Sequence, residues 1–584
     1  MAGINGTVSW QIQPLDYNSS NLAGAFWDYR ANNLKSVNDP LRYQVLWSVS
    51  GLTEGIEPSA GNFSGGNGDV VNIIFKVETT VGDGYWQELG SIKKSRDIAN
   101  KKYNDGSQPL GHRFTIDVSQ LVSNELSYSL CPINKGTWQN PYYGGMNGGL
   151  TMQDNVLGAS GGAVGTPISR YNVSRNGTFR RLKVTPYYEI INGDGEIVSA
   201  GGGVASNTIS VINSVNQFER DSLYYKNQFN HDRYSPSATA PRRFNTRCPN
   251  WYYNTTANKV AYNKSVRMDE EAEFLQWYVK ETFNAYDDTD YYNLIELYGK
   301  TFTSDGATEN EFVLVDFNSL LDDHITTQFA HNQNRMLVQN VSPAFINANA
   351  KAPQDDVRPY TTSISPITAN THRYRLYFRG HYYSDAGGSW TSIRHSAVNW
   401  YEIDREDEKK PYDYVRFHWL NSMGGIDSYT AKRDVVEGLT ISRDVIERKS
   451  GDRTWYQDDQ NQGTTMQPFL YHSDTMRGGD IYKGGREVSN VNAERVQSVY
   501  TEPLNKSVAK WLEEMMLSPN VWIEMDTEAT QMGNARNPHL RPSDKEYIPV
   551  IITNSDVETV NQENGLVKFN IEYTLSHKVI TQRN

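Results

Sequence analysis

The sequence predicts a mainly β protein, made of tandem β-sandwich domains followed by a C-terminal β-rich domain that contains one amphipathic helix. Of its 584 residues, 12% are aromatic, and 37 of these are tyrosines, which favour pleated sheets. Several stretches alternate apolar and polar residues at a period of two, as half-buried strands do. Asn, Gly, Ser and Asp, which form turns, fill the intervals between them. At roughly 100–200 residues per domain, the length predicts about three to five domains.

The first predicted domain is a β-sandwich over residues 1–225. Its clearest strand spans 41–49, where every second residue from Leu41 to Val49 is apolar. The run Asn192-Gly193-Asp194-Gly195 is a strong hairpin signal between two further strands. The remaining strands are expected over residues 70–79, 113–118, 182–190, 196–199 and 206–215.

A Gly-rich stretch over about 143–167 interrupts this domain. It has no period and lacks the Lys-Ser/Thr pair of a phosphate-binding loop. We expect a long surface loop here, or alternatively an arm that becomes ordered against a neighbouring subunit.

The second predicted domain is sandwich-like and spans 240–405. A turn over 385–389 is expected to precede its last strand, and the charged run over 404–411 reads as a linker. Strands are expected over residues 273–279, 293–298, 311–315, 335–340, 374–380 and 393–401.

The third predicted domain, 411–584, is a β-dominated α+β domain with one helix over about 504–517. Pro503 suits the first turn of this helix, and Ser518-Pro519 should end it. The apolar positions of the helix lie on one face: Val508, Trp511, Leu512, Met515 and Met516. Strands are expected over residues 414–420, 547–553 and 567–575.

The charge balance disfavours a nucleic-acid partner. The formal net charge is −12, whereas a general nucleic-acid binder needs a basic face. Arg242, Arg243 and Arg247 form a local basic cluster that we interpret as a solvated loop. No apolar run is long enough to span a membrane and no signal peptide begins the chain, so we expect a soluble protein made in a cytoplasm.

Residues that bind metals or form disulfides occur in this chain, but their spacing predicts no site. Cys131 and Cys248 lack a CxxC pattern and are expected to be free, buried thiols. His324 and His331 lie near two aspartates, and we interpret this segment as a solvated loop rather than a metal site.

The densest acidic cluster consists of Asp287, Asp288 and Asp290. Hard cations favour carboxylates, but the glycine and distal glutamate of a calcium loop are missing. A pair of carboxylates for glycoside hydrolysis would be set by the fold, so sequence carries little information on it. We therefore predict no catalytic, cofactor-binding or metal-binding residue, and no enzymatic activity.

Two groups of aromatic residues on expected loops are candidate contact residues. They are Trp138 with Tyr142-Tyr143, and Trp251-Tyr252-Tyr253. Such rings stack on sugars or form interface hot spots, although packing at the sandwich edges is the simpler interpretation.

Several stretches of the third segment carry a resemblance. Residues 415–427 read VRFHWLNSMGGID, residues 511–522 read WLEEMMLSPNVW, and residues 547–553 read YIPVIIT before the alternating strand that ends at Leu575. This order resembles a recurrent domain in structural virion proteins of tailed bacteriophages, with its W-L-N and G-G-x-D opening. Earlier segments are also similar, at Pro40-Leu41-Arg42-Tyr43 and Ser206-Asn207-Thr208-Ile209.

The resemblance implies a non-enzymatic structural component of a virion, in the tail, baseplate or neck. It also implies assembly in a bacterial host cytoplasm into a ring with other copies of the chain and with other virion proteins. The layout of a helix between strands resembles ring-forming tail domains by fold analogy alone. The alternatives are an adhesin of the virion that binds a host-surface glycan through its aromatic residues, and a polysaccharide-cleaving enzyme.

Overall fold

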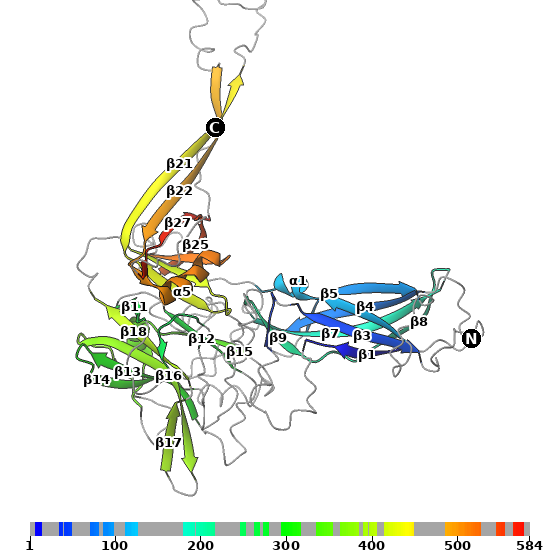
Figure 1. The fold of residues 1–584 in the computed structure, drawn as a ribbon, viewed down its shortest axis with the longest axis horizontal. Helices are drawn as coiled ribbons and strands as arrows, with labels where there is room; N and C mark the ends of the chain where they lie inside the picture. Colours follow the sequence, from blue (N-terminus) through cyan, green and yellow to red (C-terminus); the bar gives the residue numbers. More distant parts are fainter. Residues whose placement is uncertain are drawn as a thin grey trace, which may run out of the picture.

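A computed structural model shows that the protein is mainly β, as the sequence predicts (Figure 1). Its described residues contain three helices and six sheets. These residues are 6–14, 34–38, 40–49, 70–80, 86–97, 111–126, 179–192, 194–215, 244, 246–252, 262–268, 273–279, 294–316, 335–353, 362–384, 389–394, 396–405, 414–448, 485–526, 545–554 and 565–576. No helix among them is both long and apolar enough to cross a membrane.

Two sheets enclose the N-terminal core. The three-stranded sheet has the order β1 (Gly6–Ile12), β3 (Arg42–Val49), β6 (Gly111–Asp117). The six-stranded sheet has the order β2 (Leu34–Ser36), β9 (Ile209–Ile212), β7 (Phe179–Ile191), β4 (Val70–Thr80), β5 (Gln87–Asp97), with β8 (Ile197–Gly202) paired to β7. A short helix, α1 (Ser119–Ser123), follows β6 and was not predicted.

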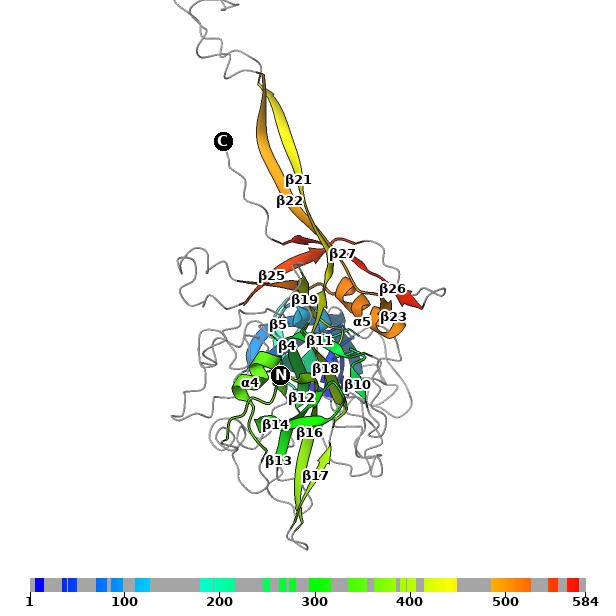
Figure 2. The ribbon, with the colours of Figure 1, turned by 90° about the vertical axis from the view of Figure 1, so that its left-hand side faces the viewer.

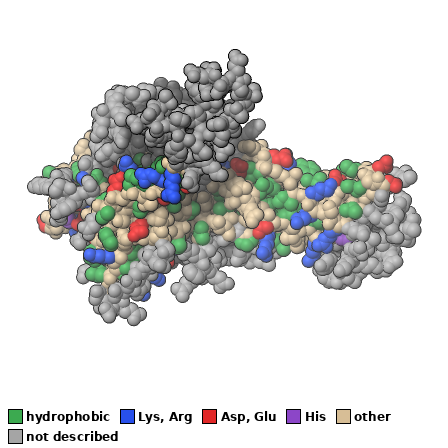
Figure 3. Space-filling view, turned by 90° about the horizontal axis from the view of Figure 1, so that it is seen from above, with side chains coloured by type: hydrophobic (Ala, Val, Ile, Leu, Met, Phe, Trp, Pro, Cys, Tyr) green, Lys and Arg blue, Asp and Glu red, His purple; other side chains and the backbone are tan. Residues whose placement is uncertain are grey.

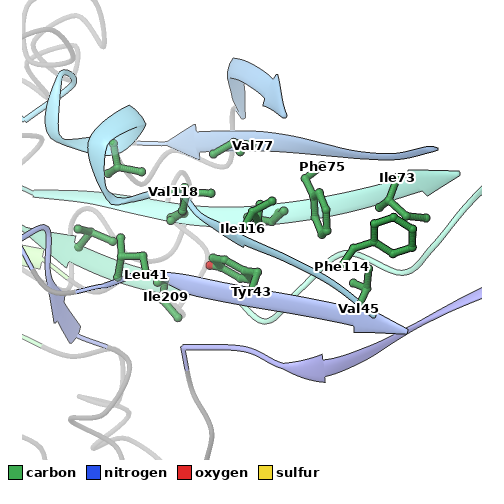
Figure 4. Packing of buried hydrophobic residues seen from close by; sticks show 14 of the residues in the cluster. Leu41, Tyr43, Val45, Ile73, Phe75, Val77, Phe114, Ile116, Val118 and Ile209 are labelled. Carbon is green, nitrogen blue, oxygen red and sulfur yellow. The ribbon is translucent and has the colours of Figure 1, made fainter. Parts of the chain in front are cut away.

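The predicted alternation explains this core. Tyr43 and Val45 of β3 point toward Ile73 and Phe75 of β4, and all four are fully buried (Figure 4). Because successive side chains of a strand point to opposite faces, one face of each sheet fills the space between the two layers.

The predicted hairpin between β7 and β8 is confirmed. The two strands pair antiparallel, and the side-chain oxygen of Asn192 accepts hydrogen bonds from the backbone N–H of Asp194 and Glu196. Gly195 adopts a φ of 86°, which glycine tolerates far better than other residues.

A seven-stranded sheet forms the middle of the chain. Its order is β10 (Trp251–Tyr252), β18 (Val398–Asp404), β16 (Thr371–Ser384), β13 (Leu294–Thr303), β14 (Thr308–Asp316), with β11 (Lys264–Arg267) parallel to β18 and β17 (Ser389–Arg394) paired to β16. A separate pair consists of β12 (Phe274–Val279) and β15 (Arg335–Asn340).

Two predictions for this region need correction. The strand expected over 393–401 is two strands, β17 and β18. Arg394 of β17 pairs with Arg379 of β16. If the same register continued, Ala397 would pair with Leu376, but Asn399 does so instead. The chain therefore contains two extra residues between the two stretches that pair with β16. An unpredicted helix, α4 (Pro343–Asn349), begins after Ser342, whose hydroxyl accepts the N–H of Phe345.

The C-terminal part holds a second seven-stranded sheet. Its order is β20 (Ile426–Ala431), β19 (Val415–Leu420), β24 (Val521–Asp526), β25 (Lys545–Ile552), β27 (Asn570–Leu575), β22 (Gly485–Tyr500), β21 (Arg433–Arg448). Helix α5 (Lys506–Leu517) packs against this sheet, and β23 (Leu504–Asn505) pairs with β26 (Leu566–Val567) beside it.

The predicted helix is confirmed, with two corrections around it. Helix α5 starts at Lys506, and Pro503 precedes β23 instead of occupying the first helical turn. The strand expected over 567–575 is broken, because Phe569 leaves the ladder and exchanges hydrogen bonds with Thr501.

The charged run after β18 does not begin as a linker. Asp404 is the last residue of β18 and forms an ion pair with Lys432, while Arg405 donates hydrogen bonds to the carbonyls of Thr368 and Thr371. The rest of the expected linker, 406–411, lies outside the described residues. The three largest buried clusters lie in the N-terminal, middle and C-terminal parts, but the predicted domain boundaries stay a prediction.

Candidate functional site

The most prominent surface feature is a long β-hairpin formed by β21 and β22. Each strand has 16 residues, and both views show the hairpin extending well beyond the rest of the described chain (Figures 1 and 2). Only the last five residues of β22, from Val496 to Tyr500, also pair with β27. The outer part of the hairpin is therefore a two-stranded ribbon.

The ribbon is amphipathic. On one face, here called the apolar ribbon face, lie Leu439, Ile441 and Val445 of β21 and Val491 and Ala493 of β22, together with the charged residues Glu437, Arg443 and Arg495. The side chains of Leu439, Ile441 and Val445 are 56%, 42% and 54% exposed. The opposite face includes Thr440, Ser442, Asn492 and Glu494, and also the exposed apolar residues Val436 and Ile446.

The apolar ribbon face continues the core face of the sheet. Val499 lies on the same side of β22 as Val491 and Ala493, pairs with Ile571 and is fully buried in the cluster that includes α5. Val435 of β21 also packs against this cluster. Beyond these residues the same face runs on without a helix over it among the described elements.

An uncovered apolar ribbon is energetically unfavourable. A two-stranded hairpin is only marginally stable alone in water. Fully burying one Leu, Ile or Val side chain is worth about 1.5–3 kcal/mol. The Glu437–Arg495 ion pair on the ribbon is 3.1 Å long but half-exposed, so it contributes at most about 1 kcal/mol. Covering this face is therefore the main source of stabilisation open to the hairpin.

The two edges of this seven-stranded sheet differ sharply. All six residues of β20, the inner edge, are buried, and strands β11 and β12 contact it. The outer edge, β21, contains neither Lys nor Pro, although it carries other charged residues such as Glu437, Arg443 and Asp444.

A buried ionic network fixes the base of this sheet to the middle part of the chain. Glu273, which precedes β12, forms ion pairs with Lys264 of β11 and Arg416 of β19, the latter at 2.8 Å. Arg416 also lies 3.5 Å from Glu524 of β24. All four side chains are at least 96% buried, so each charge has a partner in place of water.

Asp427 of β20 extends the network toward α5. It accepts hydrogen bonds from Thr246, Asn421 and the indole N–H of Trp511, at 2.6, 3.0 and 3.0 Å. Lys264 Nζ lies 3.9 Å from the Asp427 carboxylate. Immediately after β20, the Lys432–Asp404 ion pair holds the start of the hairpin.

Burial determines how these groups titrate. Burial lowers the pKa of Lys264, but Glu273 and Asp427 outweigh it, so the net pKa of this lysine is raised. Burial and the charge of Arg416 hold the pKa of His418 well below its usual range, which keeps the ring neutral beside Glu524. Burial raises the pKa of Glu514 of α5 to about 7, although nearby Arg247 opposes this shift.

The network positions elements rather than offering reactive groups. Its carboxylates are sealed from solvent and are occupied by cations or hydrogen-bond donors. Among the residues that the structure describes, no three His, Cys, Asp or Glu side chains gather in a way that could hold a metal ion.

The structure places only a few of the residues singled out in the sequence. Cys248 is a free, fully buried thiol, as expected, and burial raises its pKa well above the usual value. Arg247 is not part of a solvated basic patch: its Nε lies 3.3 Å from buried Glu514. Trp251 lies in β10 and is half-buried. Tyr252 lies in β10 as well.

The other residues lie outside the described part of the chain. They are Cys131, Trp138, Tyr142, Tyr143, Arg242, Arg243, Tyr253, Asp287, Asp288, Asp290, His324, His331 and the loop over 143–167. On the face seen in Figure 3, acidic and basic side chains of the described residues are interspersed.

Sequence reasoning missed both the hairpin and the network. The alternation of Leu439, Ile441 and Val445 with polar residues was a usable signal for a strand. Charged residues inside otherwise apolar strands, such as Arg416, signalled buried partners, but the identity of those partners depends on tertiary contacts. In comparisons with known proteins, no family model and no curated protein matches this chain.

Proposed function

We propose that this chain is a non-enzymatic structural component of a tailed-phage virion, located in the tail, baseplate or neck. It works by protein–protein assembly with its own copies and with other virion proteins. The observation that supports this best is the apolar ribbon face, an amphipathic surface on a projecting hairpin. Surfaces of this kind mark interaction sites.

The buried network supports the same function. Glu273, Lys264 and Arg416 tie the middle part of the chain to the sheet that carries the hairpin. A hairpin held on a rigid base presents its contact residues in one orientation, which lowers the entropy lost on assembly. Repeated contacts around a ring would add their affinities by multivalency.

The resemblance to virion proteins gives the proposal its location. It rests on residues 415–427, 511–522 and 547–553, which cover β19, the end of α5 and β25. Strands β19 and β25 belong to the sheet from which the hairpin extends, and α5 packs against this sheet. The glycan-binding alternative rests on aromatic residues that, apart from the β10 pair, lie outside the described ranges, and no observation on the described residues favours it.

The location can be tested with an antiserum raised against the purified chain. Density-gradient-purified tailed particles from the source lysate would be probed by immunoblot and by immunogold electron microscopy. We expect labelling at the tail, baseplate or neck of the particles. Recovery of the chain only in the soluble fraction, with unlabelled particles, would contradict the proposal.

A further inference from the structure

The outer edge strand β21 is complementary to itself when it runs antiparallel. Thr440 lies at the middle of this 16-residue strand. Leu439 and Ile441 lie one residue on either side of it, and Glu437 and Arg443 lie three residues on either side. Leu439 and Ile441 are thus symmetric about Thr440, and Glu437 and Arg443 are symmetric in position but opposite in charge. On the other face of the strand, Val436 lies as far from Thr440 as Asp444 does.

This symmetry fixes which residues would meet in a two-fold pair. In an antiparallel pair centred on Thr440, residues equidistant from the centre lie opposite each other on the same face of the sheet. Leu439 of one copy then lies beside Ile441 of the second copy, and Glu437 lies beside Arg443. Each contact occurs twice, because a two-fold interface is isologous.

We propose that β21 pairs antiparallel with β21 of a second copy of this chain, joining two hairpins into a four-stranded sheet centred on Thr440. Such a sheet gives the uncovered edge its hydrogen-bond partners and joins the two apolar ribbon faces into one broader surface. A sheet of three or more strands with an apolar face is also more stable than a lone hairpin.

The edge is suited to this pairing. From Val436 to Arg448, β21 has no bulge. The register between β21 and β22 does shift after Asp444, but the extra residue at this point, Ser489, belongs to β22. Every residue from Val436 to Ile446 is exposed. The other edge of the sheet, β20, is buried and cannot accept a strand.

The inference rests on the proposed function, since it names the partner of the same hairpin. A two-fold contact joins copies only in pairs, so ring contacts would have to lie elsewhere on the chain. The hairpin could be an assembly surface without pairing to itself, and the experiments below separate these two possibilities.

The first experiment reverses the charges. Glu437→Arg places two arginines together at each contact, and Arg443→Glu places two glutamates together. We expect either variant alone to weaken self-association, measured by sedimentation equilibrium, by roughly 10- to 100-fold. An equimolar mixture of the two variants restores both Glu–Arg contacts in the mixed pair, so it should associate as tightly as the unaltered chain.

Two controls isolate this effect. Glu494→Arg makes the same charge change on β22, away from the outer edge, and should leave association unchanged. Arg495→Gln removes the partner of Glu437 within its own chain and should also leave it unchanged. Recovery of association in the mixture shows that both single variants are folded. If the mixture associates no more tightly than the single variants, the proposed pairing is overturned.

The second experiment tests the register. Thr440→Cys places two thiols opposite each other at the two-fold axis, within the range of a disulfide, and should give a covalent dimer on mild oxidation. Ser442→Cys should not, because its counterpart lies four residues further along the second copy. Crosslinking through Cys at 442 but not at 440 would overturn the register proposed here. One combination of results separates the pairing from the proposed function. If the charge variants associate normally and the cysteine variants do not crosslink, the pairing fails. The proposed function still stands if replacing Leu439, Ile441 and Val445 with threonine abolishes assembly.

Discussion

At the scale of single residues, the buried network shows how charge is accommodated inside this protein. Arg416 donates hydrogen bonds to Thr430, Ser428 and Glu273, and its Nε lies 3.5 Å from Glu524, so most of its five N–H donors face a partner. Buried pairs of this kind stabilise little in net terms, because desolvation offsets much of the Coulomb attraction. Their removal one partner at a time is nevertheless costly, since an uncompensated charge is left behind.

Replacing Glu273 tests this reasoning. Glu273→Ala leaves Lys264 and Arg416 without their shared carboxylate, and we expect a loss of about 3–5 kcal/mol in the free energy of unfolding. Urea-induced unfolding followed by tryptophan fluorescence measures it. Glu437→Ala, which removes an exposed ion pair, is the matched control and should cost less than about 1 kcal/mol. Equal losses of unfolding free energy for both variants would refute the expected difference between a buried and an exposed ion pair.

Glu514 makes stability depend on pH. Its folded pKa is raised to about 7 by burial, from an ordinary value of 4.5. The folded chain therefore binds this proton more tightly than the unfolded chain. The contribution of Glu514 to the free energy of unfolding falls as pH rises from 4.5 to about 7, and it is constant above about pH 7.

Glu514→Gln mimics the protonated side chain at every pH. Relative to the unaltered chain, we expect this variant to gain up to about 3 kcal/mol between pH 4.5 and pH 8. Unfolding curves of both proteins across this range provide the comparison. A difference between them that does not change with pH would show that Glu514 ionises normally.

At the scale of elements, α5 illustrates which features follow from sequence. Four of its five predicted apolar positions, Val508, Trp511, Leu512 and Met515, are buried, and the fifth, Met516, is half-buried against the same core. Its start was misplaced because Leu504 and Asn505 form a short strand with β26, and that contact is remote in sequence. Local patterns thus predicted the helix and its buried face, while a tertiary contact set its boundary.

The contribution of the N-cap of α5 to stability can be tested directly. The side-chain oxygen of Asn505 accepts hydrogen bonds from the N–H groups of Ser507 and Val508, both at 3.0 Å. Asn505→Ala should destabilise the C-terminal part by about 1 kcal/mol, as loss of an N-cap does. Lys510→Ala, an exposed change on the same helix, should fall within about 0.5 kcal/mol of the unaltered chain in the same unfolding assay.

The strands show the same division between local and long-range information. Period-two patterns located β3 and β4, because each has one face in the core. The break between β17 and β18 depends on how both strands align along β16, which no local pattern encodes. Neither β21 nor β22 was predicted, although the alternation over residues 439–445 is a local signal for a strand. That the apolar face of this strand lies uncovered depends on tertiary structure.

At the scale of the whole molecule, the mainly β class followed from composition and alternation, whereas the candidate site did not. The buried network joins residues that are more than 140 positions apart in the chain, since Arg416 contacts Glu273 and Glu273 contacts Lys264. The hairpin can be recognised as a candidate surface only from the structure, which shows that no described element covers it. The aromatic and acidic clusters that stood out in the sequence lie mostly outside the described residues. They stay predictions.

The proposed assembly depends most directly on the apolar ribbon face. The decisive measurement is the mass of the full-length protein by light scattering, with negative-stain images, beside a variant carrying Leu439→Thr, Ile441→Thr and Val445→Thr. Threonine preserves the preference for a strand while removing much of the apolar surface. Asn492→Thr on the polar face is the matched control.

We expect the unaltered chain and the Asn492→Thr control to form assemblies of one fixed mass, and the triple variant to be smaller with unchanged circular dichroism. Such a result would identify the apolar ribbon face as an assembly surface. An unaltered chain that stays monomeric, or a triple variant that assembles as well as the unaltered chain, would contradict this account.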